Sequence, residues 1–289
     1  MNAGRTIVVA VRDPDSANVA LQRAMLLSDP SQDRLLLVHV SRLATLKRIL
    51  ELHPAPYPLP ESGGVPERHE WVRELAESAI AAGYDARFEV LAGEAGVAIA
   101  DIGRRENAAF VVVSTHREGQ ARELFVGSTA LRILRSSDCP VVVARGVKAQ
   151  PYRRAVIGID LDETGQRVAL ASTTMLGDVD IDLVHAYRVP QESQLRMRGV
   201  EQEEILKLRE YARSDLKPHL EAYRSAFPRA AIHLEHGFAA SVILDHVLRL
   251  RPDVLVVGKH RGSSTEERVL GSVTQFLLYS CPTDLLLVP

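Results

Sequence analysis

Short apolar runs alternate with amphipathic stretches along all 289 residues of the chain. The runs are rich in Val, Ile and Leu, which is typical of buried strands, and the stretches between them carry apolar residues at helical spacing. The expected strands are Thr6–Val11, Leu35–Val40, Arg87–Leu91, Phe110–Val113, Pro140–Ala144, Ala155–Ile159, Ile181–Ala186, Ile232–Glu235, Val254–Val257 and Thr283–Val288. The expected helices are Ala17–Leu27, Glu67–Ala82, Ala95–Arg105, Gly127–Arg135, Gln166–Leu176, Glu201–Phe227 with a break at Pro218, Ala240–Leu250 and Gly271–Tyr279. This alternation predicts parallel sheets with helices on both faces.

The same order of elements occurs twice, and one loop pattern marks the repeat. Ser114-Thr-His-Arg, nine residues and Gly127-Ser128 in the first half match Gly258-Lys-His-Arg, nine residues and Gly271-Ser272 in the second half. The repeat predicts two α/β domains, residues 1–147 and 152–289, each a doubly wound open sheet of the Rossmann-like, nucleotide-binding type. A glycine-marked loop that leads into a helix presents backbone N–H groups where a phosphate could lie.

Charge and composition exclude several classes of function. The chain holds 35 basic and 37 acidic residues, a net charge of −2, so neither a nucleic-acid partner nor a membrane-surface partner is expected. No apolar stretch approaches the roughly 18 residues that span a bilayer, and the N-terminus has no signal-peptide pattern. We therefore expect a cytoplasmic protein.

Motifs of catalysis and metal binding are missing from the sequence. There is no GxSxG elbow, no GxxxxGK[ST] loop and no HExxH pair, so no catalytic residue is assigned. His116 and His260 occupy the same position in the two repeats, but neither has a second ligand at metal-site spacing, and no metal site is expected.

Several separated motifs together resemble a tandem universal stress protein over nearly the whole chain. The signature of that family is Gly, two residues, Gly, nine residues, Gly-Ser or Gly-Thr, and the second copy reads Gly258, two residues, Arg261, nine residues, Gly271-Ser272-Val273. Other matching positions are Asp253-Val-Leu-Val-Val-Gly, Asp138-Cys-Pro-Val-Val-Val, His39 and His185 at the ends of the second strands, and Gly93 and Gly237 after the third strands.

The resemblance implies a strand order of 3-2-1-4-5 and a stress-response regulatory protein that binds ATP or a related adenine nucleotide, with or without Mg²⁺. In family members that bind ATP, an acidic residue after the first strand lies near the adenosine and the loop holds the phosphates. The residues implied in the second domain are Asp160, Gly258, Arg261, Gly262, Gly271, Ser272 and Val273. Those implied in the first domain are Gly127, Ser128 and Arg117.

The sequence departs from the family pattern more in its first half than in its second. Arg261 replaces the second signature glycine, although Gly262 follows at once. In the first half Ser114 and Arg117 replace both glycines, and Arg12 stands where the family has an acidic residue, with Asp13 next to it. A basic group there reverses the charge at the adenosine end of the site. Of the two domains, we therefore expect the second to be the one that binds a nucleotide.

Three alternatives stay open at the level of sequence. The protein could be a nucleotide-independent scaffold with two vestigial sites, or a very slow ATPase or self-phosphorylating protein. Each Gly-Ser could also be an ordinary helix N-cap, with the serine oxygen accepting a backbone N–H. The fifth strands are short and without charge, and an exposed edge of this kind invites pairing. The family resemblance implies that these strands pair the two domains within one chain, and a homodimer and an unknown protein partner are left open.

Overall fold

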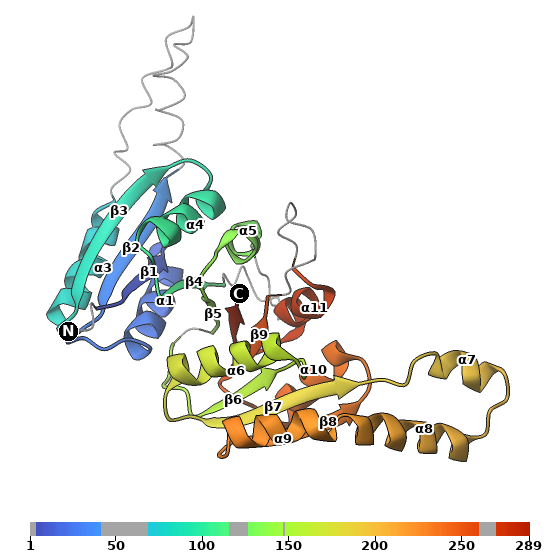
Figure 1. Ribbon diagram of the computed structural model, residues 1–289. Coiled ribbons are helices and arrows are strands. Elements are labelled where there is room, and N and C mark those ends of the chain that lie inside the picture. Colours follow the sequence, from blue (N-terminus) through green and yellow to red (C-terminus); the bar gives the residue numbers. More distant parts are fainter. Residues whose placement is uncertain (1–3, 42–68, 116–126, 147, 260–269) are drawn as a thin grey trace, which may run out of the picture. The chain divides into compact units, whose positions relative to one another are not determined.

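Two compact units make up the protein, divided between Pro151 and Tyr152. The computed structural model describes residues 4–41, 69–115, 127–146, 148–259 and 270–289 (Figure 1). The first unit contains β1 (Thr6–Ala10), α1 (Pro14–Leu26), β2 (Arg34–Ser41), α3 (Glu70–Ala81), β3 (Asp85–Ala92), α4 (Ala95–Arg105), β4 (Phe110–Ser114), α5 (Ser128–Ser136) and β5 (Val141–Ala144). The Pro54–Pro66 segment, which distinguishes the two halves in sequence, lies outside the described residues.

The second unit repeats this order with additional helices. It contains β6 (Arg154–Gly158), α6 (Glu163–Leu176), β7 (Asp180–Tyr187), α7 (Glu192–Met197), α8 (Gln202–Asp215), α9 (Lys217–Ala226), β8 (Ala231–His236), α10 (Ala239–Leu250), β9 (Val254–Gly258), α11 (Ser272–Ser280) and β10 (Asp284–Val288).

Within each unit the strands are parallel and follow the predicted order. The first unit reads β3-β2-β1-β4-β5, and the second reads β8-β7-β6-β9-β10. Helices α1 and α3 contact each other on one face of the first sheet, and α4 and α5 contact each other on the opposite face. In the second unit, α10 and α11 contact each other and correspond to α4 and α5. Apolar side chains of the central strands are almost fully buried, because helices cover both sides. The predicted α/β doubly wound fold is confirmed.

Helices α1 and α6 begin earlier than the apolar periodicity predicts, because an aspartate caps each of them. The Asp13 carboxylate accepts the Ser16 N–H at 2.9 Å, and the Asp162 carboxylate accepts the Gly165 N–H at 2.7 Å. Pro14 is the first residue of α1, a position where the missing proline N–H costs nothing. The polar first turns hid these helix starts from the periodicity.

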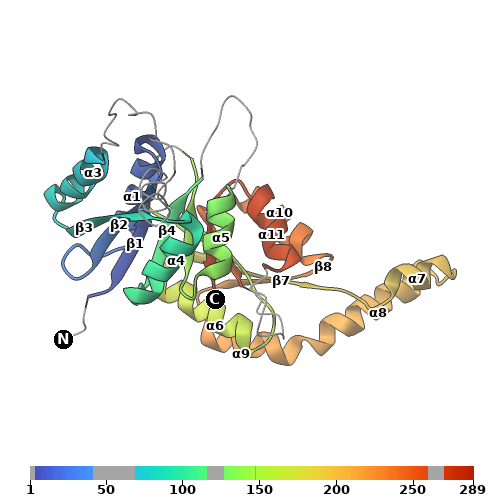
Figure 2. The same cartoon turned by 90° about the horizontal axis from the view of Figure 1, so that it is seen from above.

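Three helices, α7, α8 and α9, connect β7 to β8 in the second unit, where the sequence predicts one long helix with a break. The break falls at Leu216, and Pro218 lies in the first turn of α9, as expected. Helix α7 was not predicted. Its residue Glu192 accepts hydrogen bonds from Arg209 of α8 and pairs with His236 at the end of β8. Hydrogen bonds from Arg209 lower the pKa of Glu192 to about 2. Figures 1 and 2 both show α7 and α8 extending beyond the ends of β7 and β8.

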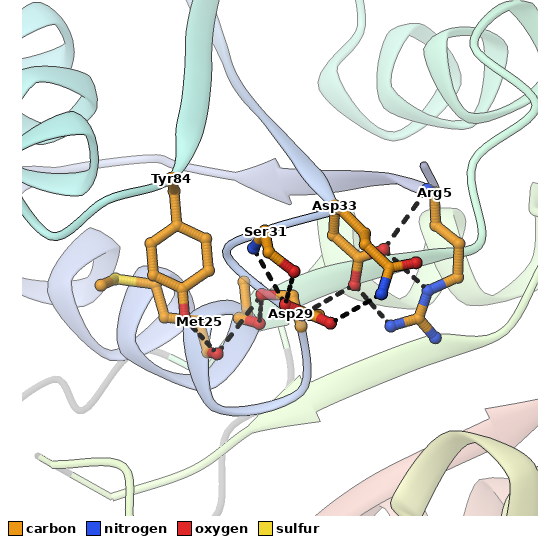
Figure 3. Close-up of polar contacts among 9 residues, drawn as sticks. Arg5, Met25, Asp29, Ser31, Asp33 and Tyr84 are labelled. Atoms are coloured by element: carbon orange, nitrogen blue, oxygen red, sulfur yellow. Dashed lines mark hydrogen bonds and ion pairs between the residues drawn. The ribbon is translucent and has the colours of Figure 1, made fainter. Parts of the chain in front are cut away.

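A polar cluster holds together the amino-terminal edge of the first sheet (Figure 3). The buried Asp33 carboxylate accepts hydrogen bonds from Arg5 Nε at 3.0 Å, from Arg5 Nη2 at 2.5 Å and from the Asp29 N–H at 2.9 Å. The Tyr84 hydroxyl, just before β3, donates to the Met25 carbonyl at 2.7 Å. These contacts join the residues that precede β1, β2 and β3, at the edge opposite to the one where such sheets bind ligands.

Asp33→Asn is expected to destabilise the first unit by about 2 kcal/mol, because it weakens two charge-assisted hydrogen bonds at a buried site. Burial would raise the pKa of Asp33, but the hydrogen bonds from Arg5 and Asp29 outweigh it and lower that pKa below its ordinary value. The stabilisation is therefore present above the ordinary pKa and is lost as the pH falls through the lowered one. Urea unfolding at neutral and acidic pH measures both effects.

Asp29→Asn is the matched control, since the exposed Asp29 carboxylate accepts hydrogen bonds from Ser31 and Gln32 in the same turn. Its loss of stability is expected to be clearly smaller. Equal losses in the two variants would show that Asp33 has no special part in fastening this edge.

Candidate functional site

The strand order reverses once in each unit, and the reversal marks a candidate site. In the second unit β6 pairs with both β7 and β9, and in the first unit β1 pairs with both β2 and β4. Chains leave the carboxyl ends of the two strands at this point toward opposite faces of the sheet, which opens a crevice. The chain after β6 and the chain after β9 therefore flank the candidate site of the second unit.

Asp160 lies one residue beyond the level of Gly258 across this reversal. Ile157 of β6 is in register with Val256 of β9, so Gly258 is level with the residue immediately before Asp160. Gly258 also lies close to α11, because the Thr274 hydroxyl donates to the Gly258 carbonyl at 3.2 Å. On the other side a Cβ at Gly258 would come within 3.1 Å of Val168 of α6. The structure thus brings together three predicted components: the β6 exit, the β9 exit and the start of α11.

The first turn of α11 carries no side-chain cap. Gly271 occupies the N-cap, Ser272 follows inside the helix, and no side chain of the described residues caps the N–H groups of this first turn. The same holds for Gly127, Ser128 and α5 in the first unit. The interpretation of each serine as an ordinary N-cap is therefore wrong, because the serine stands one residue too late. Open N–H groups and the helix dipole make such a terminus attractive to an anion.

Backbone conformation does not explain the glycines at these two caps. Gly127 has φ −63° and Gly271 has φ −57°, values that any residue adopts. Among the described residues, no atom lies within 4 Å of a Cβ placed at Gly127. By contrast, Gly93 and Gly237 after the third strands have φ 126° and 153°, a region that favours glycine. A glycine at the cap leaves the helix N-terminus open to close approach.

Asp160 is exposed, and its carboxylate makes no hydrogen bond or ion pair with any other described residue. The backbone around it is held firmly. His185 Nδ1 lies 2.9 Å from the Ile159 carbonyl, which requires a proton on Nδ1, and His39 makes the same contact with Val11 in the first unit. The histidines at the ends of the second strands thus fix the loops that follow the first strands.

The corresponding loop of the first unit is one residue shorter. Arg12 alone separates Val11 from the capping Asp13, whereas Asp160 and Leu161 separate Ile159 from the capping Asp162. Asp13 caps α1 and also forms an ion pair with Arg12 at 3.2 Å. Asp13 is therefore the counterpart of Asp162, and no carboxylate of the first unit corresponds to Asp160.

Several predicted site residues fall outside the described part of the chain. Arg117 belongs to the loop 116–126, and Arg261 and Gly262 belong to the loop 260–269. Among the predicted residues that are described, Ser272 and Ser128 are exposed and Val273 is half-buried. Over the same described ranges, no three His, Cys, Asp or Glu side chains gather in a way that could hold a metal ion. Nor does any described helix have the length and apolar character needed to cross a membrane.

Tyr223 and Gly165 take part in the site but were not predicted. The Tyr223 hydroxyl donates to the Asp160 carbonyl at 2.7 Å and to the Asp162 carbonyl at 3.2 Å. A Cβ at Gly165 would come within 1.9 Å of the Asp160 carbonyl oxygen. Glycine three residues after the capping Asp162 was a signal for such a close approach. Nothing in the sequence marks Tyr223, which lies 63 residues from Asp160.

Comparison with known proteins gives one family and a set of similar folds. The model of the universal stress protein family matches residues 4–145 and 151–289. A protein of unknown function from Pseudomonas aeruginosa PAO1 has a similar structure, with a TM-score of 0.70, 16% identity and coverage of 99% of this chain and 92% of that chain. A universal stress protein from Archaeoglobus fulgidus DSM 4304 is similar at a TM-score of 0.61 and 14% identity, covering 97% of both chains. No curated protein matches the chain.

Proposed function

Since this chain belongs to the universal stress protein family, with one match in each half, we propose that its second unit binds an adenine nucleotide of the ATP type. In this proposal the phosphates lie at the start of α11, around Gly271, Ser272 and Val273, and Arg261 and Gly262, which lie outside the described residues, stay predicted members of the site. Asp160 lies at the adenosine end. One solved universal stress protein, which matches 48% of this chain at 19% identity, is in complex with cAMP; at least one family member therefore takes a nucleotide.

One observation carries this proposal: the Asp160 carboxylate has no structural task among the described residues. Asp13 and Asp162 cap helices, whereas Asp160 is exposed beside the strand reversal. An exposed carboxylate in this position can accept hydrogen bonds from the hydroxyl groups of a ribose. The uncapped start of α11 offers the complementary chemistry, donors for an anion, on the other side of the reversal.

The first unit serves mainly as a structural partner in this proposal. Its exit loop is one residue shorter, and the loop's aspartate is engaged with Ser16 and Arg12. It does retain an open helix start at Gly127. We therefore regard the protein as a cytoplasmic stress-response regulator with one nucleotide site. In this proposal the bound nucleotide alters a surface that a protein partner recognises.

Calorimetric titration with Mg-ATP is expected to give one site per chain of micromolar strength. Binding should also raise the stability of the second unit, by about 2.7 kcal/mol at a free ligand concentration of 100 times Kd. Two sites per chain would show that the first unit also binds nucleotide. No heat, together with an unchanged melting temperature at millimolar ATP, would contradict the proposal and favour a nucleotide-independent scaffold.

A further inference from the structure

Tyr223 of α9 reaches the loop that carries Asp160 through its hydroxyl group. The residue is buried, with 1% of its surface exposed. Its hydroxyl donates to the carbonyl oxygens of Asp160 at 2.7 Å and Asp162 at 3.2 Å. Burial, together with the charges of Asp162 and Asp160, raises the pKa of the Tyr223 phenol. The phenol therefore keeps its proton and remains a donor throughout the physiological pH range.

The longer exit loop of the second unit contains the carbonyl groups that the Tyr223 hydroxyl meets. Asp160 is one of the two residues between Ile159 and the capping Asp162. A hydrogen bond within a protein contributes about 0.5–1.5 kcal/mol of net stability, so the Tyr223 hydroxyl helps to hold this loop. Gly165 completes the arrangement, since a Cβ there would come within 2.5 Å of the Tyr223 hydroxyl. Loop, helix start and tyrosine are packed as one group.

The described part of the first unit has no buried tyrosine on the helix that precedes its third strand. Its helix α3 precedes the third strand, as α9 does in the second unit, and its buried side chains are Val72, Ala76 and Ala79. None of these three can donate a hydrogen bond. The hydroxyl of the second unit thus occurs together with the longer loop and the unengaged Asp160 carboxylate, and the described residues of the first unit show none of the three.

We propose that Tyr223 is a positioning residue, which holds the Asp160 loop in the conformation that binds nucleotide and thereby sets the affinity of the second unit. The inference rests on the proposed function, because it concerns the affinity of that same site. The Tyr223 hydroxyl meets the loop at backbone carbonyls, so its effect on a ligand passes through the position of Asp160. A loop that is ordered in advance loses less conformational entropy when the ligand binds.

Tyr223→Phe removes the hydroxyl and leaves the buried ring in place. We expect the Kd for Mg-ATP, measured by calorimetry, to rise about tenfold, which corresponds to about 1.4 kcal/mol. Tyr84→Phe is the matched control, because the Tyr84 hydroxyl also donates to a backbone carbonyl, that of Met25 at 2.7 Å, but in the first unit (Figure 3). The two variants should lose similar stability, and only Tyr223→Phe should lose affinity.

Hydrogen exchange of the ligand-free proteins tests the loop independently of any nucleotide. In Tyr223→Phe, the amides of Gly165 and Gln166 at the start of α6 should exchange several times faster than in the wild type, since their acceptors both belong to Asp162. An unchanged Kd, or an equal rise of Kd in Tyr84→Phe, overturns the inference. If the wild type binds no Mg-ATP, the proposed function fails, and unchanged exchange then overturns the role of Tyr223 as well. Faster exchange in that case supports its hold on the loop.

Discussion

Gly271→Asp is expected to abolish the binding of Mg-ATP while leaving the protein folded. The new carboxylate would occupy the N-cap of α11, where aspartate is among the best caps. It would accept hydrogen bonds from the same N–H groups that we assign to the phosphates. It would also repel the phosphates, by about 4 kcal/mol for each pair of charges 4 Å apart near a protein surface. We expect Kd to rise by more than about a hundredfold in calorimetric titration.

The melting temperature of the ligand-free variant distinguishes a loss of nucleotide binding from a general loss of structure. Because aspartate satisfies an open donor at the helix start, the melting temperature of the ligand-free variant should equal or exceed that of the wild type. Gly127→Asp makes the same change at the uncapped start of α5 and should leave the affinity unchanged. Nucleotide binding that survives Gly271→Asp would exclude the start of α11 as the phosphate site.

Gly165→Ala is expected to destabilise the second unit by about 3 kcal/mol. The new methyl group would come within 1.9 Å of the Asp160 carbonyl oxygen and 2.5 Å of the Tyr223 hydroxyl. The first of these atoms is backbone, so the loop itself has to move. Urea unfolding followed by circular dichroism measures the loss, and calorimetry should show weaker nucleotide binding in the same variant.

Gly127→Ala serves as the control for this substitution. Gly127 has an ordinary φ of −63°, and a Cβ there would meet no atom of the described residues within 4 Å. The change should therefore alter stability by less than about 0.5 kcal/mol. If Gly165→Ala loses no more unfolding free energy than Gly127→Ala, the loop after β6 adjusts freely to the new methyl group. The close packing around Asp160 would then contribute nothing to the stability of the second unit.

Sequence alone predicts the fold of both units because the signal is repeated and strong. Apolar runs such as Phe110–Val113 and Val254–Val257 lie in the centre of the sheets, where helices cover both faces. Helix starts were predicted less well, since the first turns of α1 and α6 are polar and only the capping aspartates mark them. Helix α7 is six residues long, too short for a periodic pattern, and is held by Glu192 and Arg209, which are 17 residues apart.

The candidate site is predictable only in part. The resemblance to the family implies the loop glycines and Asp160, and the structure places Asp160, Gly258 and the start of α11 around the strand reversal. Tyr223 could not be predicted, because its contact depends on how α9 packs against the β6 exit. Arg117, Arg261 and Gly262 lie outside the described residues, and their roles, like the pairing of the fifth strands, stay predictions.

The shorter exit loop of the first unit makes the loss of its carboxylate hard to reverse in evolution. A single mutation Arg12→Asp would place the new carboxylate directly beside Asp13, which already caps α1. Recovery of a loop like that of the second unit requires an inserted residue, an acidic side chain and a hydroxyl from the facing helix. Under the proposed function these three features act together, so one of these changes alone is not expected to restore binding. After duplication, the two halves of the gene are therefore expected to remain specialised.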